Sequence, residues 1–221
     1  MTSPIKLSPS KLTFLYEDCK RCWWLDAYGV WKRPYTPFPS IFNSIDKVMR
    51  GAYAGQSSQL ISSDLPEGVI ETKSKRSQST PVIVDAPIHV FFSGQIDARV
   101  QFEDGTQAIV DFKTSQPKPQ NVELYRRQLM AYAYMYLMPG KGVPIETSQM
   151  GLVCVTPSDF QVTDSSVANM EMSVTYQSIP IDWEWWDTFC MELVTLLSGD
   201  EPDGKPDCPY CAMQRATMAI L

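Results

Sequence analysis

The sequence predicts an α/β fold in which helices flank a mixed central β-sheet, and its 221 residues suit one domain. Three observations lead to this prediction. Residues 95–102 alternate apolar and polar side chains, and residues 108–113 resume the alternation after a short turn, as half-buried strands do. Residues 120–138 carry apolar side chains at helical spacing. Aromatic-rich segments with helical spacing lie near both chain ends, and each is accompanied by a C-x-x-C pair.

The N-terminal part is expected to be helical. Residues 8–31 form an aromatic-rich segment, which Pro34, Pro37 and Pro39 end in a loop. A second helix is predicted at about 40–54, where apolar residues recur at helical spacing.

The remaining elements complete a sheet and a last helix. Further strands are expected near 67–72, 81–92, 148–156 and 170–178; a last helix near 183–197; and irregular segments at 56–64 and 73–80. Residues 67–180 should therefore form the core. Residues 1–56 and 183–221 should form a helical lobe that carries the cysteine pairs.

The turn Glu103-Asp104-Gly105 decides which residues of the hairpin face one another. A two-residue type I′ loop would place Asp97 and Asp111 on opposite faces of the sheet. A three-residue loop with a left-handed Gly105 instead pairs residue 102 with 106. We favour this second register because every facing pair then agrees in polarity. It sets Asp97 opposite Asp111, Gln95 opposite Lys113 and Ile96 opposite Phe112.

Two carboxylates and a lysine on one face of a hairpin indicate a metal-binding or catalytic site. Directly opposed carboxylates repel by about 0.2–1 kcal/mol, and a hard cation such as Mg²⁺ or Mn²⁺ removes that cost. Lys113, one pleat beyond Asp111, could orient or deprotonate a metal-bound water or offset charge on a phosphate. The alternative is a surface hairpin with scattered charges.

These residues resemble the PD-(D/E)xK nuclease superfamily in its RecB-like branch. Asp97 followed by Asp111-Phe112-Lys113 is similar to the signature itself, and Gln128 with Tyr132 resembles its Q-x-x-x-Y motif. The likeness runs with gaps from about residue 7, in Leu7-Ser8-Pro9, to residue 211.

The resemblance implies a single nuclease domain with a restriction-endonuclease-like core. It further implies a Mg²⁺- or Mn²⁺-dependent deoxyribonuclease, with exonuclease activity on single-stranded DNA ends and endonuclease activity besides. Asp97, Asp111 and the backbone carbonyl of Phe112 would bind the metal. Lys113 would act on the attacking water, and Gln128 and Tyr132 would support it.

A further metal ligand is expected on the second helix. Family members have a G-x-x-x-H element there, and the comparable position in this chain is Asp46. Glu71 is the fallback for this third acidic partner. His89, the single histidine, lies in a strand-like stretch and is not expected to fill the role.

Two C-x-x-C pairs, Cys19 with Cys22 and Cys208 with Cys211, can supply four thiolates to one centre that clamps the chain ends together. Resemblance to the iron–sulfur members, the CRISPR-associated adaptation nuclease and AddB-type nuclease domains, implies a [4Fe–4S] cluster. Those members use a one-plus-three arrangement of ligands, whereas this chain offers two plus two. Zinc therefore remains the alternative, followed by disulfides or free thiols. Cys154 and Cys190 lie in apolar segments and are expected to be buried core thiols.

The charge argues against tight unaided DNA binding, because the net value is −6. Basic residues gather in Lys73-Ser74-Lys75-Arg76 and Arg126-Arg127, and both groups could follow a phosphate backbone. A protein partner, in a DNA-processing or CRISPR-adaptation complex, is expected to help present the strand.

Two alternatives to an active nuclease stay open. One is a weakly or non-catalytic subunit of such a complex with a structural metal centre, which Asp46 and the acidic charge favour. The other is a zinc-clamped interaction domain. No signal peptide or membrane span is predicted, so the expected location is the cytoplasm in a prokaryotic or viral context.

Overall fold

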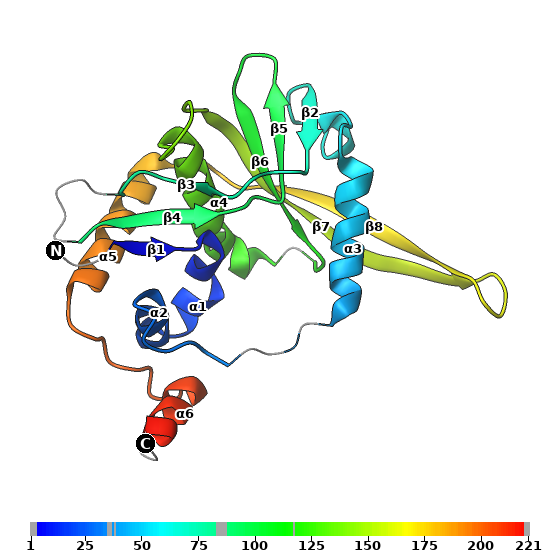
Figure 1. The fold of residues 1–221 in the computed structure, drawn as a ribbon. Coiled ribbons are helices and arrows are strands. Elements are labelled where there is room, and N and C mark those ends of the chain that lie inside the picture. The colour runs from blue at the N-terminus through cyan, green and yellow to red at the C-terminus, as the bar shows by residue number, and fades with distance from the viewer. Residues whose placement is uncertain (1–3, 35–36, 38, 83–87, 117, 219–221) are drawn as a thin grey trace.

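The computed structural model describes residues 4–34, 37, 39–82, 88–116 and 118–218 (Figure 1). The helices of these residues are η1 (Pro9–Leu12), α1 (Phe14–Asp18), α2 (Lys20–Ala27), α3 (Ser40–Tyr53), η2 (Ser58–Leu60), η3 (Pro119–Asn121), α4 (Val122–Leu137), α5 (Trp183–Ser198) and α6 (Pro209–Met218). The strands are β1 (Ile5–Leu7), β2 (Gly68–Glu71), β3 (Ser77–Gln78), β4 (Val90–Gly94), β5 (Ala98–Phe102), β6 (Gln107–Lys113), β7 (Thr147–Val162) and β8 (Ala168–Ser178).

The strands form two sheets. The larger has the order β2-β5-β6-β7-β8, in which β6 and β7 run parallel and the other neighbours antiparallel. The smaller has the order β1-β4-β3, with β1 parallel to β4. The predicted α/β class with a mixed sheet flanked by helices is therefore confirmed.

Helices cover both faces of the larger sheet. On one face Ile109 and Leu152 pack in the same cluster as Leu129 and Met130 of α4. On the other face Val110 and its neighbours pack with Met49 of α3. Strand β6 is consequently buried along nearly its whole length, whereas the alternation predicted a half-buried strand. Its parallel pairing with β7 accounts for this, because parallel strands lie inside α/β folds with both faces covered.

The first predicted helical segment is interrupted near its middle. Cys19 has an extended backbone, with φ −162° and ψ 114°, and it separates α1 from α2. The break turns the first cysteine pair towards α6, which lies beside α2 in Figure 1.

Several strand boundaries differ from the predicted ones. The expected strand 81–92 falls partly on residues 83–87, which lie outside the described residues, and β4 begins at Val90. β7 and β8 are longer than predicted, and their outer half projects from the body as an arm beyond α3 (Figure 1). Within the described part of the chain, no helix combines the length and apolar character that crossing a membrane requires.

Candidate active site and cysteine centre

The turn between β5 and β6 has the predicted three-residue form. The N–H of Phe102 donates to the carbonyl of Thr106 at 3.0 Å, and Gly105 has φ +84°. Ala98 pairs with Val110 and Val100 pairs with Ala108, so the predicted register is confirmed. The pairing ends at Ala98 and Val110, and the next residue on each strand, Asp97 and Asp111, brings two carboxylates close together.

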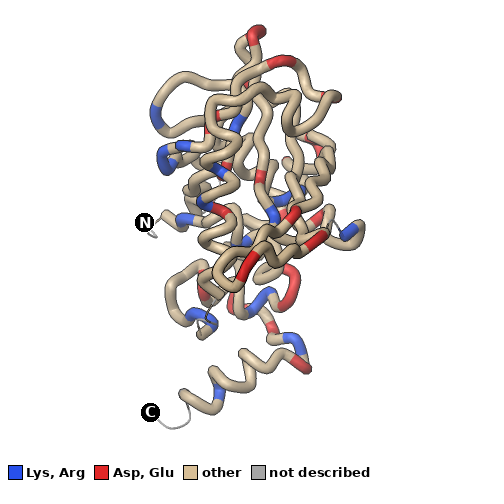
Figure 2. The backbone as a smooth tube through the Cα atoms, turned by 90° about the vertical axis from the view of Figure 1, so that its right-hand side faces the viewer, with Lys and Arg blue, Asp and Glu red and all other residues tan. Residues whose placement is uncertain are grey.

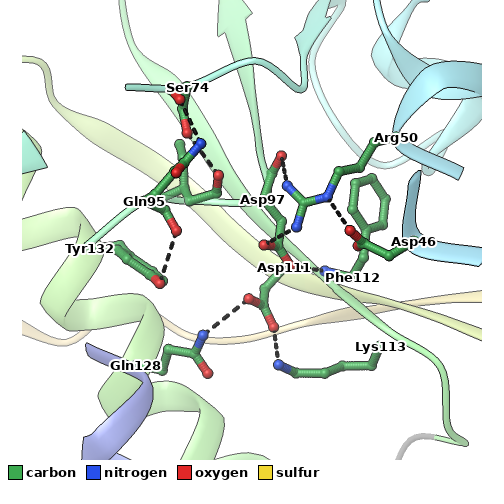
Figure 3. A network of polar contacts seen from close by, with 11 residues as sticks. Asp46, Arg50, Ser74, Gln95, Asp97, Asp111, Phe112, Lys113, Gln128 and Tyr132 are labelled. Atoms are coloured by element: carbon green, nitrogen blue, oxygen red, sulfur yellow. Dashed lines mark hydrogen bonds and ion pairs between the residues drawn. The ribbon is translucent and has the colours of Figure 1, made fainter. Parts of the chain in front are cut away.

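Asp97 is tied to β6 by its own carboxylate. Its Oδ2 accepts a hydrogen bond of 3.0 Å from the backbone N–H of Phe112, the residue after Asp111 (Figure 3). The two carboxylates are close enough that Asp97 raises the pKa of Asp111. The fold therefore brings together the two acidic groups that the alternation placed on one face.

The predicted pairing fails before Asp97, because β5 begins only at Ala98. The Gln95 amide donates to the carbonyl of Ser74 at 2.7 Å, and the Gln95 carbonyl accepts from the Tyr132 hydroxyl at 3.1 Å (Figure 3). These contacts hold Gln95 between α4 and the 73–76 loop, so it does not face Lys113.

The expected Ile96–Phe112 pair is wrong as well. Ile96 packs in the α4 cluster, whereas Phe112 packs on the other face and stacks on Tyr53 with ring centroids 5.4 Å apart. The cause is the same: Gln95 and Ile96 lie in the link between the two sheets, and their side chains do not continue the alternation of β5.

Asp111 is the most deeply enclosed acidic group of the site, with 3% of its surface exposed. Its Oδ1 accepts a hydrogen bond of 3.1 Å from Nε2 of Gln128, and its Oδ2 forms an ion pair with Lys113 (Figure 3). Burial raises the pKa of Asp111 to about 7, although the Lys113 ammonium acts in the opposite direction. Burial opposes the charged form of Lys113, but the Asp111 carboxylate outweighs it and raises the pKa of the lysine.

Sequence reasoning missed Arg50, which joins two of the acidic residues. Its Nε donates to Oδ2 of Asp46 at 2.7 Å. Its Nη2 contacts Oδ1 of Asp97 at 2.5 Å, and its Nη1 donates to the Asp97 carbonyl at 2.9 Å (Figure 3). The one signal in the sequence is its position four residues after Asp46 on α3, the spacing of an intrahelical ion pair.

The acidic residues proposed as a third ligand are less enclosed. The Asp46 side chain is 40% exposed and reaches Asp97 through Arg50. Glu71 is engaged by Arg99 at 2.7 Å. Within the described residues, neither Asp46 nor Glu71 belongs to a group of three or more His, Cys, Asp or Glu side chains close enough together to hold a metal ion.

A cleft of about 440 Å³ opens between α3 and the end of β6. Asp46, Phe112 and Lys113 line it, together with Phe42, Asn43, Met49, Thr114 and Ser115. The residues fit a hard divalent cation, because the carboxylates of Asp97 and Asp111 lie close together beside this cleft and the buried Oδ2 of Asp111 has the Lys113 ammonium as its partner. Carboxylate oxygens are the donors that Mg²⁺ and Mn²⁺ prefer.

The four cysteines of the two C-x-x-C pairs meet in one buried group. Their sulfur atoms all lie within 4.8 Å of one another, and no disulfide joins them. Cys19 to Cys211 and Cys22 to Cys211 are both 3.5 Å, and Cys22 to Cys208 is 3.7 Å. The predicted clamp between the two chain ends is thus formed, and it is suited to a metal centre.

Hydrogen-bond donors favour the thiolate form of Cys19, whereas burial raises the pKa of Cys22 and of Cys211. Burial raises the pKa of Cys19, but backbone N–H groups of Cys22 and Lys205 outweigh it and lower the value to about 6. Arg21 and Arg33 donate to the sulfurs of Cys211 and Cys22. Two guanidinium groups therefore offset the negative charge that thiolate ligands bring to this centre.

The two basic groups of the sequence differ in their contacts, and Figure 2 shows basic and acidic residues interspersed along the chain. Arg126 is 9% exposed and pairs with Asp182, and Arg127 pairs with Glu17. These two arginines are held by the protein's own carboxylates, which leaves them less available to a phosphate backbone than the sequence alone indicated.

The 73–76 loop does present basic side chains to solvent. Lys73, Lys75 and Arg76 are exposed and form no ion pair with any described residue. The Ser74 hydroxyl ties this loop to the site by donating to the carbonyl of Ile96 at 2.8 Å.

Comparisons with known proteins agree with this architecture. A family model described as the PD-(D/E)XK nuclease superfamily matches residues 45–216. The crystal structure of SSO0001 is similar with a TM-score of 0.50 and 15% identity, covering 100% of this chain and 89% of that chain. At this identity the likeness concerns the fold alone. No curated protein matches the chain significantly.

Proposed function

Because the chain belongs to the PD-(D/E)XK nuclease superfamily, we propose that it is a Mg²⁺- or Mn²⁺-dependent deoxyribonuclease with its site at Asp97, Asp111 and Lys113. One observation carries the proposal. A buried carboxylate, Asp111, is held between the Gln128 amide and the Lys113 ammonium, directly beside a second carboxylate. Stability alone does not account for this arrangement, since a buried ion pair often adds no stability over apolar packing.

The chain's own residues have distinct roles in hydrolysis. Asp97, Asp111 and the Phe112 carbonyl would hold the divalent ion, which when bound lowers the pKa of a coordinated water and polarises the phosphate. Lys113 would orient that water or hold the charge that grows on the phosphate. Gln128 keeps Asp111 in place, and Tyr132 anchors the segment before Asp97 through the Gln95 carbonyl.

We propose single-stranded DNA ends as the substrate, with exonuclease activity first and endonuclease activity second. The exposed 73–76 loop supports a path for the phosphate backbone beside the site, because Ser74 contacts both Gln95 and Ile96. The acidic net charge of −6 predicts that this path binds weakly, and its few basic side chains predict a shallow dependence of affinity on salt.

For the cysteine centre we propose a single tetrahedrally coordinated ion, with zinc as the principal candidate. Four sulfurs at about 2.3 Å from one ion stand about 3.8 Å from one another. In this chain three of the separations are 3.5–3.7 Å, and all four sulfurs lie within 4.8 Å of one another. In a [4Fe–4S] cluster each thiolate binds a different iron, so the sulfurs would have to move apart. Metal analysis with an absorption spectrum decides between them: stoichiometric zinc in a colourless protein supports the proposal, and a brown protein contradicts it.

A second candidate function is a weakly or non-catalytic subunit of a DNA-processing or CRISPR-adaptation complex. Arg50 favours it, because it takes up the carboxylates that an ion would need. A largely apolar groove of about 370 Å³ between α3 and the β7–β8 arm also favours a protein partner. It is lined by Ser44, Ile45, Val48, Met49, Val155, Met170 and Met172.

The test compares cleavage of end-labelled single-stranded DNA, double-stranded DNA and RNA, with Mg²⁺ or Mn²⁺, by the wild type, Asp111→Asn and Lys113→Met. We expect wild-type cleavage of single-stranded DNA and a loss of at least about 10³-fold in both variants, since metal binding and water activation are removed. Near-native circular dichroism spectra would show that the fold persists. A wild type that cleaves nothing with either ion supports the second candidate.

A further inference from the structure

We propose that Arg50 is a substrate-binding cation of this site, which holds Asp97 until a divalent ion binds and then contacts the scissile phosphate. The inference rests on the proposed nuclease function and goes beyond it. It assigns a second basic residue to the site, on a different element from Lys113.

The hydrogen bonds show for which oxygen of Asp97 the Arg50 guanidinium and a divalent ion would compete. Oδ2 is held by the backbone N–H of Phe112 at 3.0 Å, so Oδ1 is the oxygen that can turn to a cation. Oδ1 contacts Nη2 of Arg50 at 2.5 Å. Nη2 must therefore leave Oδ1 before that oxygen can bind a divalent ion.

Two other bonds of Arg50 can remain after that exchange. Nε donates to Asp46 and Nη1 donates to the backbone carbonyl of Asp97, and neither depends on Oδ1. The guanidinium thus stays anchored beside the site while the N–H groups of Nη2 become free. A planar guanidinium with free N–H groups suits a phosphate oxygen.

The formal charges of the site point the same way. Three carboxylates (Asp46, Asp97 and Asp111) face two cations (Arg50 and Lys113), which leaves one net negative charge. A divalent ion reverses this to one net positive charge, and one phosphodiester then makes the site neutral. Without Arg50 the metal-loaded site would already be neutral, and the charge of the phosphate would be uncompensated.

A purely structural role for Arg50 makes the opposite prediction about metal. If the guanidinium only fixes Asp97 in place, its removal disorders that ligand and weakens metal binding. If the guanidinium competes for Oδ1, its removal strengthens metal binding. The sign of the change in metal affinity therefore separates the two roles without any activity measurement.

The experiment uses Arg50→Met, Arg50→Lys and a matched control, Arg99→Met. Arg99 also pairs with a carboxylate, Glu71, and its side chain is 24% exposed against 26% for Arg50. Binding of Mn²⁺ is followed by electron paramagnetic resonance. Binding of a short single-stranded DNA is followed by fluorescence anisotropy, with Ca²⁺ and with chelator.

We expect Arg50→Met to bind Mn²⁺ at least about fivefold more tightly than the wild type, and to bind DNA at least about tenfold more weakly in Ca²⁺ but equally in chelator. Arg50→Lys should recover part of the DNA affinity, and Arg99→Met should match the wild type in both assays. Weaker Mn²⁺ binding by Arg50→Met, or unchanged DNA binding in Ca²⁺, would overturn the inference. A wild type that shows this metal-dependent DNA binding yet cleaves nothing would instead contradict the proposed nuclease function alone.

Discussion

Oδ1 of Asp111 accepts a hydrogen bond of 3.1 Å from Nε2 of Gln128, which lies seventeen positions later on α4. Both side chains are buried, so the amide cannot be replaced there by bulk water. The bond also leaves Oδ2 directed at Lys113 (Figure 3). Gln128 therefore determines which oxygen of Asp111 is available to a cation.

We predict that Gln128→Leu weakens Mn²⁺ binding by about 10–100-fold, the usual cost of losing an outer-shell partner of a metal ligand. Isothermal titration calorimetry measures the affinity. Gln107→Leu is the matched control, because Gln107 is equally buried on the same strand as Asp111 and its amide contacts Thr147 instead. Both variants should lose some stability, but only Gln128→Leu should lose metal affinity. Equal affinities in the two variants would contradict a positioning role for Gln128.

The hairpin was predictable because residues close together in the sequence determine its turn and register. Gly105 and the alternation on either side of it determine the turn, and the turn determines that Asp97 and Asp111 lie on one face. The four cysteines were predictable for a different reason, since two C-x-x-C pairs can supply four thiolates to one centre.

Arg50 was not predictable, because nothing near it in sequence indicates a bond to a residue 47 positions away. The start of β5 was missed for a related reason. Residues 95–97 alternate like a strand, but contacts to Ser74 and Tyr132 from other elements hold Gln95 elsewhere. Arg126 likewise pairs with Asp182, 56 positions later, and a charge count cannot foresee that.

The raised pKa of Asp111 predicts a pH-dependent metal requirement. Its value in the metal-free protein is about 7, above the ordinary 3.8, because burial favours the protonated form. Only the carboxylate binds the ion, so a proton competes with Mn²⁺ below pH 7 and the competition fades above it. We expect apparent Mn²⁺ affinity to fall about tenfold per pH unit below about pH 7 and to level off above about pH 8. Titrations from about pH 5.5 to about pH 8.5 measure this.

The same pKa shift has a consequence for stability. In the metal-free protein, a carboxyl whose pKa is raised by folding makes its full contribution to the free energy of unfolding below its pKa in the unfolded chain. That contribution is lost as the pH rises through about 7, the pKa in the folded protein. Added Mn²⁺ should therefore raise the melting temperature more at about pH 8 than at about pH 6. A metal affinity that does not change between about pH 5.5 and about pH 7 would contradict the assignment of Asp111 as a ligand.

Loss of the cysteine centre should loosen the C-terminal helix before the core. The four sulfurs join α6 to the start of α2, and the main apolar clusters contain none of these cysteines. We predict that Cys211→Ser, or removal of the metal by chelation, costs about 3 kcal/mol and lowers the melting temperature by about 6–12 °C. Limited proteolysis should then release residues 209–218 first.

Cys190→Ser is the control for this prediction. Cys190 is buried in the apolar cluster around α5, so its replacement should lower stability without changing metal content or the order of proteolysis. If Cys211→Ser keeps its full metal content and the wild-type cleavage pattern, the cysteine group is not the link between the chain ends.

The turn between β5 and β6 can be tested by replacing its Gly105 and, as a control, Gly51 of α3. Gly105 has φ +84°, a conformation that costs other residues roughly 1–2 kcal/mol, so Gly105→Ala should be destabilising by about 1 kcal/mol. Gly51 lies in α3, where an added Cβ would meet nothing within 4 Å apart from its chain neighbours and the surrounding helix backbone, so Gly51→Ala should be stabilising by about 0.5–1 kcal/mol. Urea unfolding of both variants measures the difference.

The flanking Asp104 carboxylate accepts two hydrogen bonds of 2.8 Å from Thr106, which should keep the loop length unchanged in Gly105→Ala. Because the register then persists, Gly105→Ala should retain wild-type Mn²⁺ affinity, and a stabilising Gly105→Ala would contradict the left-handed turn on which the facing of Asp97 and Asp111 depends.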